Sequence, residues 1–206
     1  MKRIWLIRHG RPDYGTEESR CIGISDIPLS EEGRNAMMCL GLRAAEQEGD
    51  FLRNAVFFSS PLERAMDSCR AFLRGAGLEG RKITACERFR EVDLGTWDGL
   101  TFREVRERFP EEYQVRGEHP GTFRTPGGET IEEAGVRFFQ SLNDLILTTE
   151  KDMVIFSHSG AIRAALCILQ GLSCDRYREF PLPFGGITEL RYEEGRKITV
   201  CGRAFL

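Results

Sequence analysis

The sequence lacks the features that place a protein in a membrane or in an oxidising compartment. At the amino terminus, the apolar run 4–7 stops at Arg8, and no stretch approaches the roughly 18 apolar residues of a membrane span. The seven cysteines are odd in number, and none forms a Cys-x-x-Cys pair. This pattern gives no support to a disulfide framework, a zinc site or a redox motif. We therefore expect a cytoplasmic protein with reduced thiols, no membrane partner and no bound metal.

An excess of positive charge is also missing. The 29 Lys and Arg residues are outnumbered by 32 Asp and Glu, which gives a net charge of −3 and a sequence pI of about 5.8. General nucleic-acid binders carry a basic surface, so we expect a small molecule as partner and no nucleic acid. The 206 residues, of which 41% are hydrophobic, suit a single domain that can bury its own core.

Short apolar segments alternate with segments of helical pattern. Strands are expected at 2–7, 54–58, 82–86, 152–157, 187–192 and 197–201. Helix starts are marked by residues that suit an N-cap or follow a turn: Ser30, Ser60 with Pro61 behind it, Thr101, Thr130 and Gly160. This alternation predicts a three-layer α/β/α sandwich with a largely parallel central sheet. In such folds the active site lies at the carboxyl ends of the strands.

Residues 88–130 have a different composition. They are rich in charged and aromatic side chains, contain several Pro and Gly, and show no clear strand pattern. We expect them to form an insertion within one domain, 1–206, that covers the active-site end of the sheet. Trp97 and its aromatic neighbours are expected to form the interior of this insertion.

The chain has only three histidines, and two of them follow predicted strands. His9 stands in Arg8-His9-Gly10 after the first strand, and His158 follows the strand 152–157. Parallel strands end at the same edge of a sheet, so both rings should reach one ligand crevice. His158 also precedes a helix whose free amino-terminal N–H groups favour an anion.

Two arginines and one carboxyl group extend this arrangement. Arg8 precedes His9, and Arg64 falls in the first turn of a helix that follows a strand. Guanidinium groups bind phosphoryl oxygens through paired hydrogen bonds. Glu91 supplies a carboxyl group that can protonate a leaving oxygen, with Glu87, Asp93 and Asp98 as acidic competitors for that role.

With these residues in place, the chain resembles the histidine phosphatase superfamily, also called the phosphoglycerate mutase-like family. Six blocks match in the family's order and span nearly the whole chain: 6–10, 26–33, 60–65, 91–101, 126–130 and 157–160. The resemblance implies that His9 is the nucleophile and forms a phosphohistidine. It implies that Arg8, Arg64 and a protonated His158 bind the transferred group, and that Glu91 is the proton donor. No metal or cofactor is implied.

Three positions depart from the family pattern: Arg11 stands where many members have an acidic or amide residue, Pro12 where they have Ser or Thr, and Gly15 is the third. Gly15 stands where many members have an asparagine, so a phosphate contact would have to come from Arg20 or from a backbone N–H. We expect Arg20, Gly10 and Ser159 as further substrate contacts. Arg116, like other arginines of this region, is left open between a substrate contact and a surface role.

The resemblance predicts a metal-independent phosphomonoesterase that acts through phosphohistidine. Length and the 126–130 block are most similar to small bacterial α-ribazole phosphatases of cobalamin assembly, which makes α-ribazole 5′-phosphate a candidate substrate. Two alternatives stay open. One is a phosphoglycerate mutase, whose longer insertion and tail this chain lacks. The other is a family member that binds phosphorylated ligands without catalysis, which the intact set of reactive residues argues against. The oligomeric state is not predicted.

Overall fold

A computed structural model describes residues 1–15, 20–195 and 197–203. Its strands form one six-stranded sheet in the order β3-β2-β4-β1-β5-β6. Their bounds are β1 Lys2–Arg8, β2 Val56–Ser59, β3 Ile83–Ala85, β4 Met153–Ser157, β5 Ile187–Tyr192 and β6 Thr199–Arg203. Neighbours from β3 to β1 are parallel, whereas β5 and β6 are antiparallel additions at one edge. The prediction of a largely parallel sheet is confirmed, and every predicted strand is present with small shifts of its ends.

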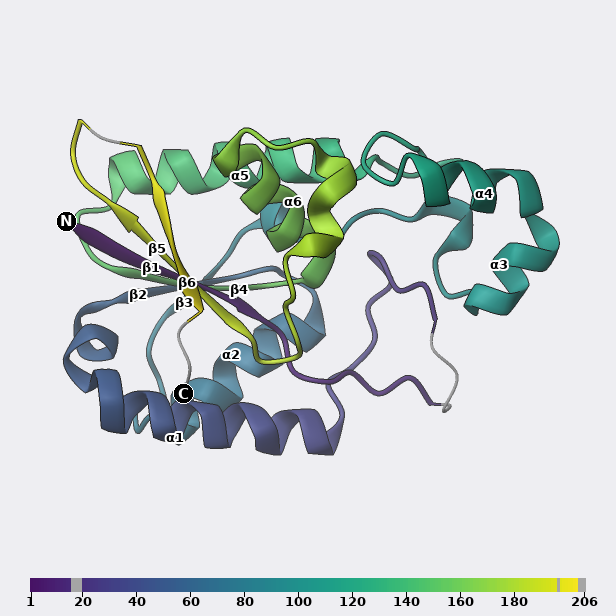
Figure 1. Cartoon of the computed structure of the whole chain (residues 1–206). Coiled ribbons are helices and arrows are strands. Elements are labelled where there is room, and N and C mark those ends of the chain that lie inside the picture. Colours follow the sequence, from purple (N-terminus) through teal and green to yellow (C-terminus); the bar gives the residue numbers. More distant parts are fainter. Residues whose placement is uncertain (16–19, 196, 204–206) are drawn as a thin grey trace.

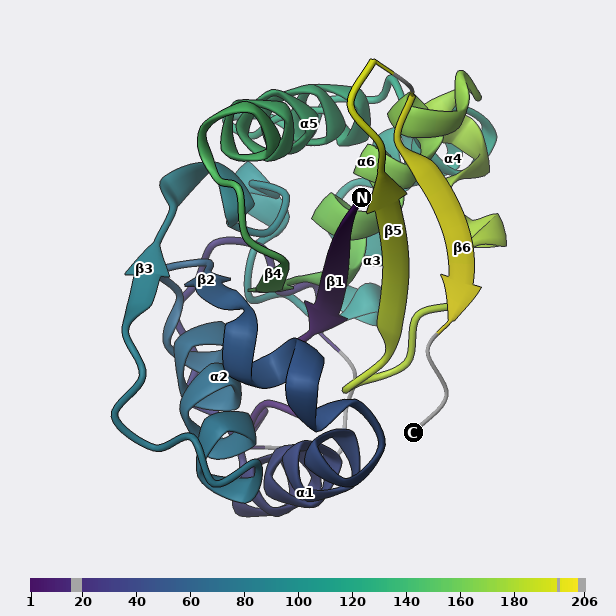
Figure 2. The same cartoon turned by 90° about the vertical axis from the view of Figure 1, so that its left-hand side faces the viewer.

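Helices cover both faces of the sheet, as Figures 1 and 2 show. One face carries α1 (Glu31–Asn54) and α2 (Glu63–Gly75), and the other carries α5 (Ile131–Thr148) and α6 (Ser159–Gln170). Alternate side chains of β1 point to opposite faces, so Trp5 packs in the core beneath α1 and α2 while Leu6 packs beneath α5 and α6. The three-layer α/β/α prediction is confirmed.

Three of the predicted helix caps form as expected. The Ser30 hydroxyl accepts a hydrogen bond from the N–H of Gly33 at 3.0 Å, and Thr101 and Thr130 both form complete capping boxes. The predicted cap at Ser60 is wrong: α2 begins at Glu63, and its N-cap residue makes no side-chain cap. The Ser60 hydroxyl accepts the backbone N–H of Leu62 at 3.3 Å, just before the helix, and lies 2.7 Å from Nε2 of His158.

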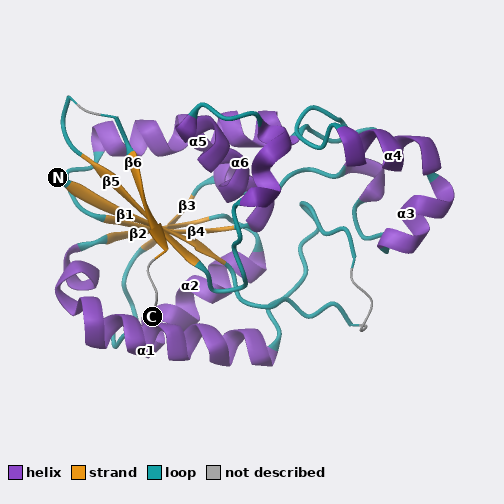
Figure 3. Ribbon diagram, viewed as in Figure 1, coloured by secondary structure: helices purple, strands orange, loops and turns teal. Residues whose placement is uncertain are grey.

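The segment 88–130 contains two short helices beyond the carboxyl end of β1, α3 (Phe102–Arg108) and α4 (Pro110–Glu118), as Figures 1 and 3 show. The 3-10 helices η1 (Glu87–Phe89) and η2 (Gly95–Trp97) lie at the start of this segment, and the longer 3-10 helix η3 (Cys174–Glu179) follows α6. Sequence reasoning missed α4, although Pro at its first position is a typical start signal. Trp97 is only 2% exposed and its ring lies against Phe109, Tyr113 and Phe123, which confirms its place in a small core.

Among the described helices, none is long and apolar enough to cross a membrane.

Candidate active site

The two strand-end histidines lie next to each other. β1 and β4 are neighbouring parallel strands with Arg8 paired to Ser157, so the residues that follow, His9 and His158, leave the sheet at the same edge. Their ring centroids are 5.0 Å apart with an angle of 58° between the planes. His9 is 5% exposed and His158 is fully buried. Residues 149 positions apart in the chain therefore form one buried pair of imidazoles.

One hydrogen bond fixes the tautomer of His9. Its Nδ1 lies 2.6 Å from the carbonyl oxygen of Gly10, and since a carbonyl only accepts, Nδ1 carries the proton. Burial lowers the pKa of His9 well below its ordinary value, and the positive charge of Arg64 lowers it further. The ring is therefore neutral, with an unprotonated Nε2 that has the lone pair a nucleophile needs.

His158 is neutral in this structure as well. Burial lowers the pKa of His158 well below its ordinary value, with further lowering from Arg64 and His9. Its Nε2 contacts Ser60, and its Nδ1 is buried without a hydrogen-bond partner among the described residues. The sequence-based expectation of a protonated His158 does not fit this environment, because burial penalises the charged ring. A bound phosphate dianion would supply the negative charge that favours protonation.

Arg64 is held from behind by a loop. It is 1% exposed, and its Nη2 and Nη1 donate to the carbonyl oxygens of Gly23 at 2.6 Å and Ser25 at 2.8 Å. The carboxylate of Asp98 accepts the backbone N–H groups of the same two residues at 2.9 and 2.8 Å. Asp98, one of the competitors for the acid role, thus orients the loop that orients Arg64.

Arg8 is fixed by contacts that leave part of its guanidinium unused. Nη1 donates to the carbonyl oxygen of Leu182 at 2.8 Å, and the guanidinium carbon lies 3.8 Å from the centre of the Phe184 ring. Its Nε is buried and has no partner among the described residues. Burial lowers the pKa of Arg8, although arginine stays protonated at any physiological pH. Two fixed cations thus flank the histidine pair, and both feel the charge of Glu91.

The carboxylate of Glu91 lies at the amino terminus of α6. Its oxygens accept the N–H groups of Gly160 at 3.2 Å and Ala161 at 2.9 Å. Glycine at position 160 leaves room for this carboxylate, since a Cβ there would lie 2.7 Å from Oε1 of Glu91. The anion that this helix start was expected to attract is therefore a carboxylate of the chain itself in this structure. Of the four acidic candidates, Glu91 is the one whose carboxylate contacts the start of the helix that follows His158.

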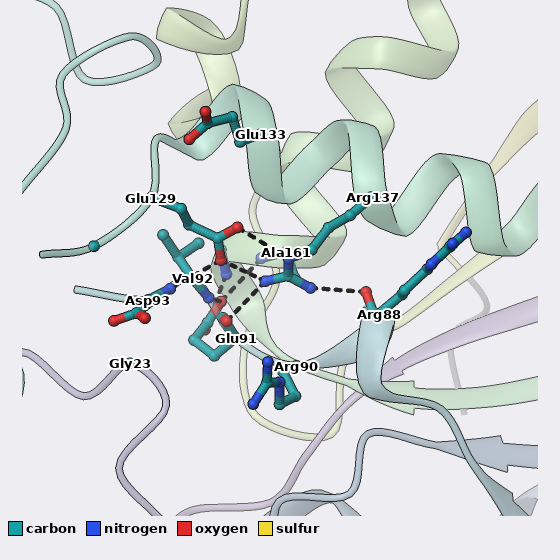
Figure 4. A network of polar contacts seen from close by, with 12 residues as sticks. Gly23, Arg88, Arg90, Glu91, Val92, Asp93, Glu129, Glu133, Arg137 and Ala161 are labelled. Atoms are coloured by element: carbon teal, nitrogen blue, oxygen red, sulfur yellow. Dashed lines mark hydrogen bonds and ion pairs between the residues drawn. The ribbon is translucent and has the colours of Figure 1, made fainter. Parts of the chain in front are cut away.

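An ion pair fixes the backbone on both sides of Glu91 (Figure 4). Arg137 of α5 donates to the carbonyl oxygens of Arg88 at 2.7 Å and Glu91 at 2.8 Å. Its Nε and Nη2 also donate to the two carboxylate oxygens of Glu129 at 3.0 and 2.7 Å. Glu129 in turn accepts the N–H of Asp93 at 2.9 Å. The sequence assigned no individual role to Arg137 or Glu129.

We expect Arg137→Gln to act on catalysis through Glu91. A displaced proton donor should lower kcat roughly tenfold to hundredfold for alkyl phosphates and less for nitrophenyl phosphate, which needs no proton on its leaving group. KM should change little. Arg124→Gln is the matched control, since Arg124 also pairs with a glutamate, Glu133, at the start of α5. Equal losses for both leaving groups would show a purely structural role.

The two neutral histidines also predict a pH dependence of stability. Their pKa values are lowered in the folded protein, whereas the unfolded chain binds protons near pH 6.5. Folding stability is therefore fully present above about pH 6.5 and falls below it, by up to about 1.4 kcal/mol per pH unit for each ring. Urea unfolding between pH 7.5 and 5 measures this slope. The double variant His9→Asn/His158→Gln should flatten the slope, and an unchanged slope would contradict neutral rings.

The residues predicted as further substrate contacts differ in whether they face the site. Gly10 faces the protein rather than a ligand, since its N–H donates to Ser68 and a Cβ would meet the carbonyl oxygen of Gly33 at 2.8 Å. Arg20 donates to the carbonyl oxygen of Gly99 at 2.8 Å. Gly15 is exposed, and the residues that follow it, 16–19, lie outside the described part of the chain.

A cavity of about 480 Å³ opens beside Glu91. Arg20 and Ser159 are part of its lining, together with Trp97, Phe102 and Tyr113 from the segment 88–130. A volume of this size accommodates a small organic molecule. Within residues 1–15, 20–195 and 197–203, no group of three or more His, Cys, Asp or Glu side chains is arranged to hold a metal ion.

Comparison with known proteins gives relatives along the full length. Phosphoserine phosphatase 1 of Hydrogenobacter thermophilus is 26% identical over 199 residues, covering 96% of this chain and 90% of the relative. A 2,3-bisphosphoglycerate-dependent phosphoglycerate mutase of Gloeobacter violaceus is 27% identical over 187 residues, covering 89% and 83%. The structure of a mycobacterial glucosyl-3-phosphoglycerate phosphatase in complex with VO3 superposes with a TM-score of 0.80 at 25% identity, covering 98% of each chain.

The family assignment rests on a match over nearly the whole chain, which is longer than any of the six sequence blocks. The family model for the histidine phosphatase superfamily (branch 1) matches residues 4–202. That range includes both strand-end histidines, both arginines and Glu91. The sequence blocks predicted this superfamily, and the chain belongs to branch 1 of the histidine phosphatase superfamily.

Proposed function

We propose that this protein is a phosphomonoesterase that needs no metal and acts in the cytoplasm on a small phosphate ester through a phosphohistidine. The observation that carries the proposal is the neutral ring of His9, with its proton fixed on Nδ1, in a buried site shared with His158. Arg8 and Arg64 supply the positive charge that a metal ion supplies in other phosphatases.

The first half-reaction breaks the ester. Nε2 of His9 attacks phosphorus in line, and the bond from phosphorus to the leaving oxygen breaks. Arg8 and Arg64 donate hydrogen bonds to the phosphoryl oxygens, whose charge they offset. Glu91, entering in its protonated form, gives its proton to the leaving oxygen, which departs as an alcohol.

The second half-reaction regenerates the histidine. Glu91, now a carboxylate, takes a proton from water as the water oxygen attacks phosphorus. The bond from phosphorus to Nε2 breaks, inorganic phosphate leaves, and His9 returns to its neutral form. In this scheme His158 accepts a proton only while the phosphate is bound, since burial keeps the ring neutral otherwise.

The segment 88–130 is proposed to form part of a single domain and to select the leaving group, because its side chains line the cavity beside Glu91. The relatives' names point to phosphoserine and phosphoglycerate derivatives as substrates of those proteins. The sequence resemblance adds α-ribazole 5′-phosphate, whose aromatic base would suit the aromatic part of the cavity lining. All three classes belong in one substrate panel.

A phosphoglycerate mutase is the second candidate, because several relatives carry that name. It would use the same phosphohistidine but pass the phosphoryl group to a second hydroxyl instead of water. A coupled assay that interconverts 3- and 2-phosphoglycerate separates the two. Mutase turnover above the rate of phosphate release would overturn the hydrolase proposal.

The proposal is tested with a panel of phosphate esters assayed with and without EDTA. We expect release of inorganic phosphate at rates that EDTA does not change. A loss of activity with EDTA that is restored by a divalent metal would contradict the mechanism. Tight binding of phosphate esters without any turnover would favour a non-catalytic role.

A further inference from the structure

The cavity beside Glu91 is lined by an excess of positive charge. Arg116 comes from α4, Arg163 from α6 and Arg178 from η3, and all three line the cavity. Arg20 adds a fourth guanidinium, while Glu91 is the only acidic residue among the described residues of that lining. These four arginines come from four separate segments of the chain. Their proximity is therefore a result of the tertiary fold and not of one charged helix.

The first three arginines have no ion-pair partner among the residues that the structure describes. Arg116 lies with its guanidinium carbon 5.6 Å from the Trp97 ring, and Arg178 donates from Nε to the hydroxyl of Tyr177 at 3.1 Å. Arg163 is half-buried, and its Nε is buried without a hydrogen-bond partner in the described part of the chain. Many exposed arginines elsewhere are paired, for example Arg176 with Glu179 and Arg108 with Glu104.

Gathering like charges at the rim of a cavity has an energetic cost. Burial lowers the pKa of Arg163; Tyr177 and Glu91 oppose this effect and the charge of Arg178 adds to it. A cavity with low-dielectric walls and one sign of charge concentrates its field on an anion. Guanidinium donors without partners match carboxylate or phosphate oxygens best, since both accept paired hydrogen bonds.

We propose that the alcohol part of the substrate carries a second anionic group, a carboxylate or a phosphate, which Arg116, Arg163 and Arg178 bind. This inference rests on the proposed phosphatase function and names the substrate class of the same site. Aromatic side chains of the lining, Phe102 and Tyr113, contact the uncharged part of the leaving group. Anionic esters then rank above α-ribazole 5′-phosphate, whose nucleoside part is neutral.

A pair of matched esters tests the inference. 3-Carboxyphenyl phosphate and 3-carbamoylphenyl phosphate have almost the same shape, but only the first carries a second anion. Intrinsic reactivity favours the carbamoyl ester slightly, because its leaving group is the better one. We expect kcat/KM of the wild-type protein to be roughly tenfold to hundredfold higher for the carboxylate ester. Glycerol 1,3-bisphosphate against glycerol 1-phosphate tests the phosphate form of the second anion.

Arginine variants test which residues cause the preference for the anionic ester. Arg163→Gln, Arg116→Gln and Arg178→Gln should each lower the ratio of the two kcat/KM values at least about threefold, and the triple variant should bring it near one. Arg106→Gln is the control, because Arg106 is exposed on α3 and does not line the cavity; it should keep the wild-type ratio.

The outcomes distinguish the second-anion inference from the phosphatase proposal. A wild-type ratio near one for both matched pairs, with clear turnover of all the esters, would overturn the second-anion inference and leave the phosphatase proposal standing. A preference for the anionic esters that survives in the triple variant would also overturn it. Turnover of none of these esters, with or without a second anion, would count against the phosphatase proposal itself.

Discussion

The His9→Ala variant is expected to lose on the order of 10⁴-fold or more in kcat/KM for every phosphate ester that the wild type hydrolyses. The reason is that the reaction begins with bond formation at Nε2, and Gly10 fixes the tautomer that leaves this atom unprotonated. Neighbouring groups cannot replace it, since Nε2 of His158 already contacts Ser60. Release of inorganic phosphate, followed under single-turnover and steady-state conditions, measures the loss.

His119→Ala is the matched control for this variant. His119 is exposed at the carboxyl end of α4, so its removal should leave kcat/KM within about twofold of the wild type. The His9→Ala protein should still bind inorganic phosphate, because Arg8 and Arg64 keep their contacts. Hydrolysis by a folded His9→Ala protein at more than about one hundredth of the wild-type rate would exclude His9 as the nucleophile.

Glu91→Gln has the second largest expected effect, and its size should depend on the leaving group. For alkyl phosphates, whose alkoxide must be protonated as it departs, we expect kcat to fall roughly 10²-fold to 10⁴-fold. For nitrophenyl phosphate, whose leaving group is stable as an anion, the first half-reaction should fall far less. The measurement is the slope of log kcat against the pKa of the leaving group. This slope should be steeper in the variant than in the wild type.

Glu87→Gln is the control for the acid. Glu87 lies four residues before Glu91 and pairs with Arg90 in an exposed ion pair, so its replacement should not change the slope. A Glu91→Gln variant with the wild-type slope would remove Glu91 from the role of proton donor. The structure would then leave Glu91 as a cap for α6, through its bonds to Gly160 and Ala161.

The fold could be predicted from sequence because its signals are local or periodic. Short apolar runs such as 153–156 mark strands buried on both faces, and alternation with helices implies parallel pairing. Once β1 and β4 are neighbours, His9 and His158 must leave the sheet at the same edge. The meeting of these two rings therefore follows from topology, which the residue pattern indicates.

What sequence could not predict are the partners that tertiary packing chooses. The spacing at Ser60 indicates a helix cap, but the helix begins at Glu63 and the Ser60 hydroxyl also contacts His158. Arg137 looks like an ordinary helix residue until α5 packs against the strand-end segment that holds Glu91. The lowered pKa of the ligand-free His158 ring could not be predicted either, because burial of the ring depends on every element around it.

The arginines of the cavity show the same limit. Arginine is abundant in this chain, so Arg163 and Arg178 have no distinctive sequence signal. Their proposed role in binding follows from the cavity that they share and from the lack of an acidic partner among the described residues. The only sequence cue for Arg163 is its position about one helical turn after His158, at the start of the helix that follows the strand.

The most direct test of the central claim is to trap the covalent intermediate. The protein is incubated with a ³²P-labelled ester, quenched in alkali and digested for peptide mapping. We predict label that is stable in base and labile in acid, up to one phosphate per chain, on the peptide that contains His9. Label on any other residue, or full turnover without label at any quench time, would contradict a phosphohistidine mechanism at His9.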